Sequence, residues 1–501
     1  MASLAIELES LAVTRYKHRR RVGDHICRPF DLTHGSARWG VAPRRAGLSR
    51  LWRLVRIADV PLGPQDCRFF RAMAIRFNGV PAAKLVPKAS LIEDPTLLTI
   101  SGQILGHAAV RAPVLESRPA VPADQRPNRL TSIVTTMKNE GPFLLEWIAY
   151  HRVIGVTDFL VYTNDCTDGT DTFLALLQEK GLCQHRANPW RPGAPTSPQH
   201  TALQVAADEP TIRQADWVIC MDVDEYINVK IGDGTLAALY QAVGEANMVS
   251  LTWRLFGNSA VVAYEDQPVI AQFDRCAPEV IRKPHQAWGF KTLFRNIDIF
   301  RKLGVHRPKA LKPELWEQIT WVNGSGRPMP ISVLRNGWRS SISTYGYDWV
   351  QLNHYAVRSV ESFLVKRDRG RVNHTDRDQG SSYWFRMNHN IDTDRSIQRM
   401  IPALKAEMTR LLADPDIRAA QDACVASHRA KITELMARPD QRAFHDELAG
   451  PRMVRLCQMQ QHFGSAVFTA GPQVIPDAIA FREDLPADFF FTVANETEAS
   501  P

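Results

Sequence analysis

Between residues 131 and 221 the sequence alternates short apolar runs with segments of helical spacing. Thr131–Met137, Asp158–Thr163 and Trp217–Met221 have the length and composition of buried strands, and helical segments separate them. Strands that alternate with helices form right-handed βαβ units, which build a parallel sheet with helices on both faces. The sequence therefore predicts an α/β fold with a doubly wound, mainly parallel sheet.

Polar side chains follow each of these three runs directly. They are Lys138, Asn139 and Glu140 after the first run, Asn164 and Asp165 after the second, and Asp222 and Asp224 after the third. The carboxyl ends of parallel strands lie at one edge of the sheet, where α/β proteins bind their ligands. We therefore expect these side chains to form one polar crevice.

The two aspartates of the third set are candidate metal ligands. Asp222 and Asp224 are two residues apart, so both carboxylates face the crevice if the chain stays extended over that step. Hard oxygen ligands suit Mg²⁺ or Mn²⁺, and such an ion neutralises a leaving diphosphate as a Lewis acid. An isolated Asp-x-Asp also occurs in solvated loops, so the motif alone leaves both interpretations open.

Taken in order, three runs are much more specific than the single motif. They are TTMKNEGPFLLEWIAYH (135–151), VYTNDCTDGT (161–170) and CMDVDEY (220–226). Together they resemble the family-2-like glycosyltransferases with the GT-A fold, over about residues 130–375. The resemblance implies a metal-dependent enzyme that binds a nucleotide-sugar donor and a glycan or lipid-linked acceptor.

The resemblance also implies roles for individual residues. Lys138, Asn139, Glu140, Asn164 and Asp165 match positions near the nucleotide, Asp222 matches the position that binds the ribose, and Asp222 and Asp224 match the metal ligands. A later histidine completes the metal site in many relatives, and His306 is the first choice here, with His354 second. The usual paired aspartates after the second strand are Thr163 and Asn164 in this chain, which leaves the nucleotide open.

An inverting transfer also needs a carboxylate base to deprotonate the acceptor hydroxyl. Of the acidic residues after the metal motif, Asp266 is our choice, because its loop follows the strand-like run Met248–Phe256. A retaining reaction would need no such base. The cations Lys366, Arg367, Arg369 and Arg371 have two equal interpretations, a solvated helix face or a clamp on a diphosphate.

The remaining segments suggest further domains. We predict a basic extension at residues 1–58, a small β-rich module at 59–115, a proline-containing linker at 116–128, a glycosyltransferase domain at 129–390 and a helical region and tail at 391–501, irregular after Gly464. Residues 44–58 include a basic amphipathic helix. It either docks on the next domain, which we favour, or contacts the inner face of a membrane peripherally.

Charge and composition exclude other classes of protein. Residues 1–58 hold 12 Lys and Arg against 4 Asp and Glu, which accounts for the whole formal net charge of +8. The rest of the chain is neutral overall, so we expect no nucleic-acid partner. No run approaches the about 18 apolar residues of a membrane span. Eight scattered cysteines without metal spacing predict free thiols and a cytoplasmic location.

Two rival functions remain. Val218–Asp224 also resembles the nucleophile strand of haloacid-dehalogenase-like phosphatases, although Glu225-Tyr226 follows it here and strand–helix units precede it. The second rival is an inactive transferase-like adaptor at a membrane surface, against which the intact Asp-x-Asp argues.

Overall fold

The computed structural model describes residues 130–330, 332–370 and 379–494. The predicted basic extension (1–58), its membrane-contacting segment (44–58), the β-rich module (59–115) and the linker (116–128) lie outside the described residues. Those four predictions are therefore not tested.

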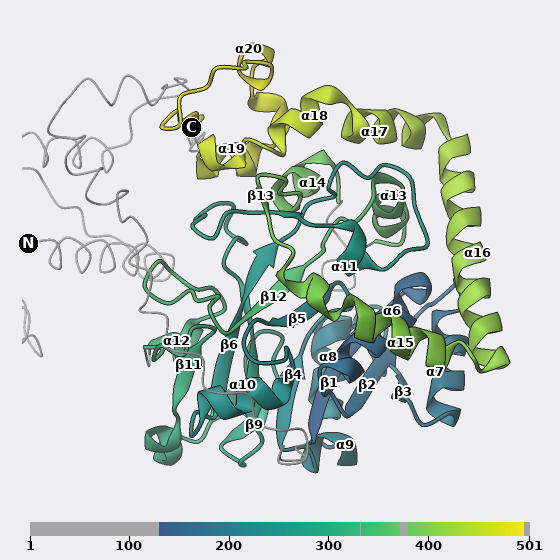
Figure 1. Cartoon of the computed structure of the whole chain (residues 1–501), viewed down its shortest axis with the longest axis vertical. Coiled ribbons are helices and arrows are strands. Elements are labelled where there is room, and N and C mark those ends of the chain that lie inside the picture. Colours follow the sequence, from purple (N-terminus) through teal and green to yellow (C-terminus); the bar gives the residue numbers. More distant parts are fainter. Residues whose placement is uncertain (1–129, 331, 371–378, 495–501) are drawn as a thin grey trace, which may run out of the picture. The chain divides into compact units, whose positions relative to one another are not determined.

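A central nine-stranded sheet organises the described part of the chain (Figure 1). Its main path runs β3-β2-β1-β4-β8-β6-β12-β5, and β11 pairs with β6 beside this path. The strands are β1 (Thr131–Met137), β2 (Asp158–Thr163), β3 (Gln184–Ala187), β4 (Trp217–Cys220), β5 (Glu225–Val229), β6 (Met248–Leu255), β8 (Phe290–Arg295), β11 (Trp321–Asn323) and β12 (Val350–His354).

The first half of the sheet is parallel, as expected for βαβ units. β2 pairs in parallel with β1 and β3, and β1 pairs in parallel with β4. β8 then runs antiparallel to both β4 and β6, and β5 runs antiparallel to β12. The antiparallel β8 brings its first residues, Phe290 and Lys291, to the edge of the sheet where β4 ends.

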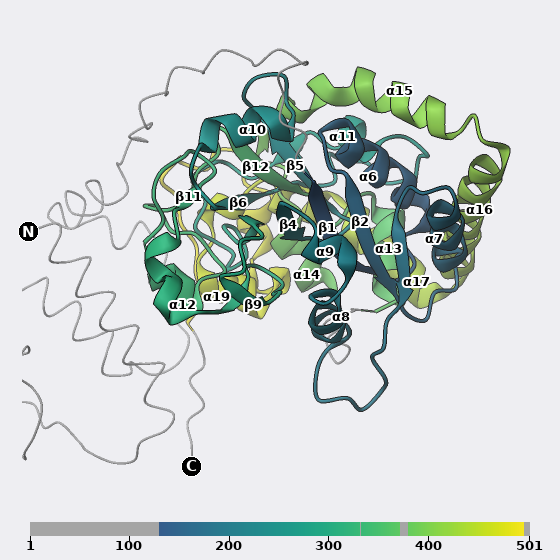
Figure 2. The ribbon, with the colours of Figure 1, turned by 90° about the horizontal axis from the view of Figure 1, so that it is seen from below.

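Alternate side chains of β1, β2 and β4 enter two different cores, because successive side chains of a strand point to opposite faces. Ile133 of β1 and Ile219 of β4 belong to the larger core, which α6 (Gly141–Val153), α7 (Thr170–Glu179) and α10 (Leu236–Val243) cover. Val134 and Val218 belong to the smaller core, with α8 (Pro198–Ala206) and α9 (Pro210–Arg213). Figure 2 shows α6 and α10 on one side of the strands and α8 on the other. The predicted α/β class with a mainly parallel, doubly wound sheet is confirmed.

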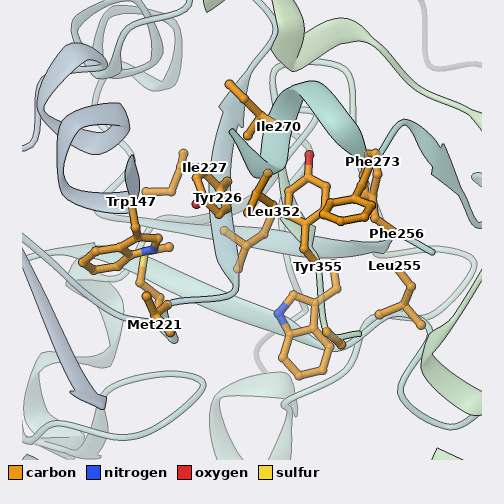
Figure 3. Packing of buried hydrophobic residues seen from close by; sticks show 14 of the residues in the cluster. Trp147, Met221, Tyr226, Ile227, Leu255, Phe256, Ile270, Phe273, Leu352 and Tyr355 are labelled. Carbon is orange, nitrogen blue, oxygen red and sulfur yellow. The ribbon is translucent and has the colours of Figure 1, made fainter. Parts of the chain in front are cut away.

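Large aromatic side chains fill the larger core. Figure 3 shows Trp147 of α6 close to Met221, and Tyr226, Leu352 and Tyr355 packed beside them. Trp147 Nε1 donates a hydrogen bond to the carbonyl of Glu225 at 2.9 Å, so the indole also fixes the chain just after the two aspartates. Burying side chains of this size contributes on the order of 2–3 kcal/mol each.

The predicted helical C-terminal region is confirmed, and it packs directly on the sheet domain. It contains α15 (Ile401–Leu411), α16 (Pro415–Ala437), α17 (Pro439–Ala449) and α18 (Pro451–Leu456). Asp414 caps α16 by accepting hydrogen bonds from the amides of Asp416 and Ile417. A Cβ at Gly141 would lie 2.6 Å from Cys424 Sγ, so glycine at the start of α6 lets α16 approach closely. The tail expected to be irregular contains two short helices, α19 (Ser465–Ala470) and α20 (Asp477–Ala480).

Short elements connect these parts. They are α11 (Val269–Gln272), β7 (Arg275–Cys276), β9 (Phe300–Lys302), β10 (Lys309–Leu311), η4 (Pro313–Gln318), α12 (Ser332–Asn336), α13 (Val360–Asp368), α14 (Ser381–Met387), β13 (Asp392–Thr393), η5 (Ser396–Met400), η6 (Gln460–His462) and η7 (Pro472–Val474). Among the residues described, no helix is both long and apolar enough to span a membrane. The six described cysteines are free thiols, as expected.

Candidate functional site

The loops that follow β1 and β2 are joined by hydrogen bonds. Asn139 Nδ2 donates to Thr167 Oγ1 at 2.9 Å, and Asn139 Oδ1 accepts from the Thr167 amide at 2.8 Å. Asn139 and Asp165 both have a φ of 51°, a left-handed conformation that Asn and Asp adopt more readily than most residues. The structure thus brings these two predicted segments side by side at the carboxyl edge of the sheet.

Asp222 lies two residues beyond Cys220, where β4 ends, and two side chains hold its carboxylate. Its Oδ1 accepts a hydrogen bond from Gln199 Nε2 at 2.9 Å, and its Oδ2 accepts one from Lys291 Nζ at 3.1 Å. Gln199 comes from α8 and Lys291 from β8, so a flanking helix and a neighbouring strand of the sheet both fix this carboxylate. About a third of the Asp222 side chain stays exposed, which leaves it accessible to a ligand.

Glu225 lies behind Asp222 and is fully buried. Its Oε2 accepts the amide of Asp222 at 2.8 Å, and its Oε1 accepts Trp253 Nε1 at 2.6 Å. Burial raises the pKa of Glu225 to about 7, although the Lys291 ammonium 3.6 Å away opposes the shift. Burial lowers the pKa of Lys291, but Asp222 and Glu225 outweigh that effect, and the pKa lies above its ordinary value. Glu225 and Lys291 therefore form a buried support for Asp222.

Asp224 is more buried than Asp222 and has different partners. Its Oδ2 accepts a hydrogen bond from Lys366 Nζ at 2.7 Å, and its Oδ1 lies 3.6 Å from His354 Nε2. Burial raises the pKa of the Asp224 carboxyl, but Lys366 and His354 lower it by more than burial raises it. The pKa of Asp224 therefore lies well below its ordinary value. Asp224 is consequently ionised near neutral pH.

Glu140 is clamped between two arginines. Arg358 Nη1 donates to Glu140 Oε2 at 2.9 Å, and Arg369 Nη2 pairs with Glu140 Oε1. Arg369 also donates to the carbonyls of Lys138 and Asn139, and the Arg358 guanidinium lies 3.6 Å from the centre of the Phe143 ring. Burial raises the pKa of Glu140, but Arg369 and Arg358 outweigh it and lower the pKa below its ordinary value. The arginines tie the end of β1 to the chain that follows β12.

The structure thus separates the predicted residues into a group of acids around the end of β4 and a group of loop residues after β1 and β2. Asp222 and Asp224 lie at the end of β4, and Glu140 shares the cation cluster around Asp224, since Arg358 acts on both carboxylates. Lys138 and Asn139 offer their carbonyls to Arg369, and Asn164 hydrogen bonds to Asp165 at 3.1 Å. Lys366 and Arg369 face these acids and are not part of a solvated helix face, whereas Arg367 lies 4.1 Å from the centre of the Phe444 ring.

The predicted metal ligands do not all gather. Within residues 130–330, 332–370 and 379–494, no three His, Cys, Asp or Glu side chains form a metal-binding group. His354, the second choice, is the histidine beside Asp224, and its buried Nδ1 has no hydrogen-bond partner. His306 instead bonds through Nδ1 to the carbonyl of Phe290 at 3.0 Å. Of the two candidate histidines, His354 is therefore the one that could share a divalent ion with Asp224.

The predicted base Asp266 is exposed, in the loop before α11. It interacts with Tyr264, whose ring neighbours are Phe143 and His428. In the part of the chain that the structure describes, no hydrogen bond or ion pair joins Asp266 to Asp222 or Asp224. Its role as the base stays a prediction.

Three residues of the site were missed by sequence reasoning: Gln199, Lys291 and Arg358. Glu225 was expected at this edge of the sheet as part of the polar run after the third strand, but without a role. Lys291 offered a signal, because a lysine inside the apolar run GFKTLF needs a carboxylate partner once the strand is buried. Gln199 and Arg358 offered none, since nothing local in the sequence distinguishes them from surface residues.

Comparisons with known proteins identify similar glycosyltransferase sequences. A family model described as Glycosyltransferase family 92 matches residues 131–314. A glycosyltransferase family 92 protein of Ricinus communis is 31% identical over 101 residues, which cover 20% of this chain and 17% of the relative. One of Arabidopsis thaliana is 30% identical over 95 residues, 19% of this chain and 16% of the relative. The chain thus spans less than a fifth of the length of these curated relatives.

Among solved structures, a mannosyltransferase of Pyrobaculum calidifontis in complex with GDP-Man and Mn²⁺ is 13% identical, with 68% of this chain and 91% of that chain covered and a TM-score of 0.26. A TM-score this low carries no argument about the site. The sequence similarities support a glycosyltransferase, and they point to family 92, whereas the family-2-like assignment stays a prediction.

Proposed function

We propose that this chain is a glycosyltransferase that moves a sugar from a nucleotide-sugar donor to an acceptor hydroxyl at the carboxyl edge of β1, β2 and β4. One observation carries the proposal. The family 92 match over residues 131–314 contains all three strand-end motifs, and those motifs meet where Asp222 and Asp224 lie. The same match favours a transferase over the phosphatase, and the intact Asp222 and Asp224 favour an active transferase over the inactive adaptor.

The charges around Asp224 suit an anionic donor. Lys366, Arg358 and Arg369 bring three positive charges to two buried carboxylates, those of Asp224 and Glu140. The excess of positive charge favours a diphosphate, because guanidinium and ammonium groups stabilise phosphate oxygens by charge-assisted hydrogen bonds. In this proposal Lys366 and Arg369 fix the donor diphosphate and stabilise the charge that develops on the leaving group.

A divalent ion would require local rearrangement, since no three His, Cys, Asp or Glu side chains of the described residues form a metal-binding group. Asp222, Asp224 and His354 would hold Mn²⁺ or Mg²⁺, which bind few protein ligands and keep positions for phosphate oxygens. When bound, the ion acts as a Lewis acid that neutralises the diphosphate. Lys366 now neutralises Asp224, so we expect ion binding and the Lys366–Asp224 pair to compete.

A thermal-shift screen of nucleotide sugars tests the proposal. We expect one nucleotide sugar, with Mn²⁺, to raise the melting temperature of the wild type, and Asp224→Asn to lose that increase. Asp208→Asn is the matched control, because the Asp208 side chain is mostly exposed and forms an exposed ion pair with Arg213. If no nucleotide sugar stabilises the wild type, or if Asp224→Asn responds like the control, the proposal is wrong. Hydrolysis of a simple phosphoester that depends on Asp222 would favour the phosphatase instead.

A further inference from the structure

A cavity of about 850 Å³ lies next to Asp222, on the α8 face of the sheet. Residues of α8, β10, η4 and α12 line it, and Figure 2 shows α8 and α12 on the side of the strands away from α6 and α10. The residues that line it are Ser197, Gln199, His200, Val305, His306, Arg307, Lys309, Ala310, Leu311, Trp316, Leu334, Gly337 and Trp338. Its volume is in the range of small-molecule sites.

Two residues that line the cavity connect it to the candidate site. Gln199 lines the cavity and donates a hydrogen bond to Asp222 Oδ1 at 2.9 Å. The ring of His306, which also lines it, lies 5.2 Å from Trp338 and 5.6 Å from Trp253, and Trp253 lies 4.7 Å from His354. A ligand in the cavity is therefore one side chain away from Asp222.

The walls combine aromatic rings with positive charge. Trp316 and Trp338 are partly exposed, so each has indole surface available to a ligand. Arg307 and Lys309 add two cations, and the described lining residues include no Asp or Glu. Burial and the charge of Lys291 lower the pKa of His306 to about 3, so His306 is neutral at pH 7. Indole faces pack against the apolar faces of sugar rings, and the cations attract an anionic group.

The nucleotide has another place in the proposed function. The segments assigned to it, Lys138–Glu140 and Asn164–Asp165, do not line the cavity, and they meet the site through Arg369 and Thr167. Asp222 thus stands between a cation cluster suited to the donor diphosphate and a cavity suited to a second substrate.

We propose that this cavity binds the acceptor, and that the acceptor is a carbohydrate that carries a carboxylate or a phosphate. The proposal rests on the proposed glycosyltransferase activity and adds the class of acceptor. Trp338 packs on a sugar ring, Lys309 and Arg307 bind the acidic group, and Gln199 positions the chain of sugars beside Asp222.

Binding of acidic and neutral sugars by isothermal titration tests this assignment. The probes are a tri-galacturonic acid, a hexose phosphate and a neutral trisaccharide of galactose, each added to the full chain. We expect one of the two acidic probes to bind at least about 10-fold more tightly than the neutral one, and the better probe tells a carboxylate from a phosphate. Lys309→Gln should weaken that binding about 10-fold.

Lys302→Gln is the matched control, since Lys302 is an exposed lysine of β9 that pairs with Lys309 in register but does not line the cavity. Trp338→Leu should weaken acidic and neutral probes alike, because it removes the stacking surface. Equal binding of acidic and neutral probes, or equal effects of Lys309→Gln and Lys302→Gln, would overturn the assignment.

Donor binding separates this proposal from the one on which it rests. The melting-temperature increase with nucleotide sugar and Mn²⁺ should survive in Lys309→Gln. If the wild type shows no such increase, the proposed function fails. If Lys309→Gln loses it while the wild type keeps it, the cavity holds the donor and the acceptor assignment is wrong.

Discussion

Glu140→Gln should destabilise the protein strongly, because it removes the carboxylate between two buried guanidinium groups. The Glu140, Arg358 and Arg369 side chains are 6%, 6% and 9% exposed, so water cannot replace the lost charge. Breaking a buried ion pair from one side typically costs about 3–5 kcal/mol. Glutamine preserves the shape of the side chain, so the loss measures the missing charge and not a cavity. We expect the free energy of unfolding to fall by about that amount.

The pH dependence provides a second readout of the same variant. Arg369 and Arg358 depress the folded-state pKa of Glu140. The stability from its ionised form is therefore present above the unfolded-state pKa and is lost as the pH falls through the folded-state pKa. The difference in unfolding free energy between wild type and Glu140→Gln should be full at pH 7 and shrink below about pH 4.

Urea unfolding followed by tryptophan fluorescence, at a series of pH values, measures both effects. Asp208→Asn, the same chemical change in an exposed pair, should leave the curves almost unchanged. The proposed role of Glu140 is wrong if Glu140→Gln loses no more unfolding free energy than Asp208→Asn, or if its loss does not vary with pH.

Two further variants test the buried parts of the fold. Burial raises the folded-state pKa of Glu146 from 4.5 to about 7. Between these two pH values the folded state keeps a proton that the unfolded state releases, so the free energy of unfolding declines by about 3 kcal/mol as the pH rises from 4.5 to 7. Glu146→Gln should remove that part of the decline in urea unfolding between pH 4.5 and 7, and an unchanged slope would contradict the assignment. Leu352→Ala should lower the free energy of unfolding by about 2–5 kcal/mol, since Leu352 of β12 is fully buried. Ile342→Ala, at an exposed position, should lower it little, and similar losses for the two variants would contradict the burial of Leu352.

The parallel half of the sheet could be predicted because its signals are local. β1 and β2 begin and end where their apolar runs do, and β4 ends one residue earlier than expected, at Cys220. β8 and β12 were not predicted, because Lys291 and Asn353 interrupt their apolar patterns. Both polar side chains are buried and have partners from distant parts of the chain, Asp222 for Lys291 and Asn228 for Asn353, so their environment depends on long-range pairing.

The candidate site, like the sheet, could be predicted from the sequence only in part. The position of Asp222 and Asp224 followed from the strand before them, since a strand of a parallel sheet ends at the ligand-binding edge. The cations that hold them come from β8 and from the segment between Arg358 and Arg369, far along the chain. Long-range ion pairs leave no periodic pattern, so the choice between a solvated face and an inward-facing cluster needed the structure.

The most direct test is transfer itself. Full-length protein is incubated with the nucleotide sugar that stabilises it, Mn²⁺ and the acidic or neutral oligosaccharide that it binds, and product is detected by mass spectrometry as an acceptor heavier by one sugar residue. The account predicts product with the wild type and Asp208→Asn, and loss of product with Asp224→Asn or with excess EDTA. Undiminished transfer by Asp224→Asn, or release of inorganic phosphate from phosphoesters with no sugar transferred to any acceptor, would contradict it.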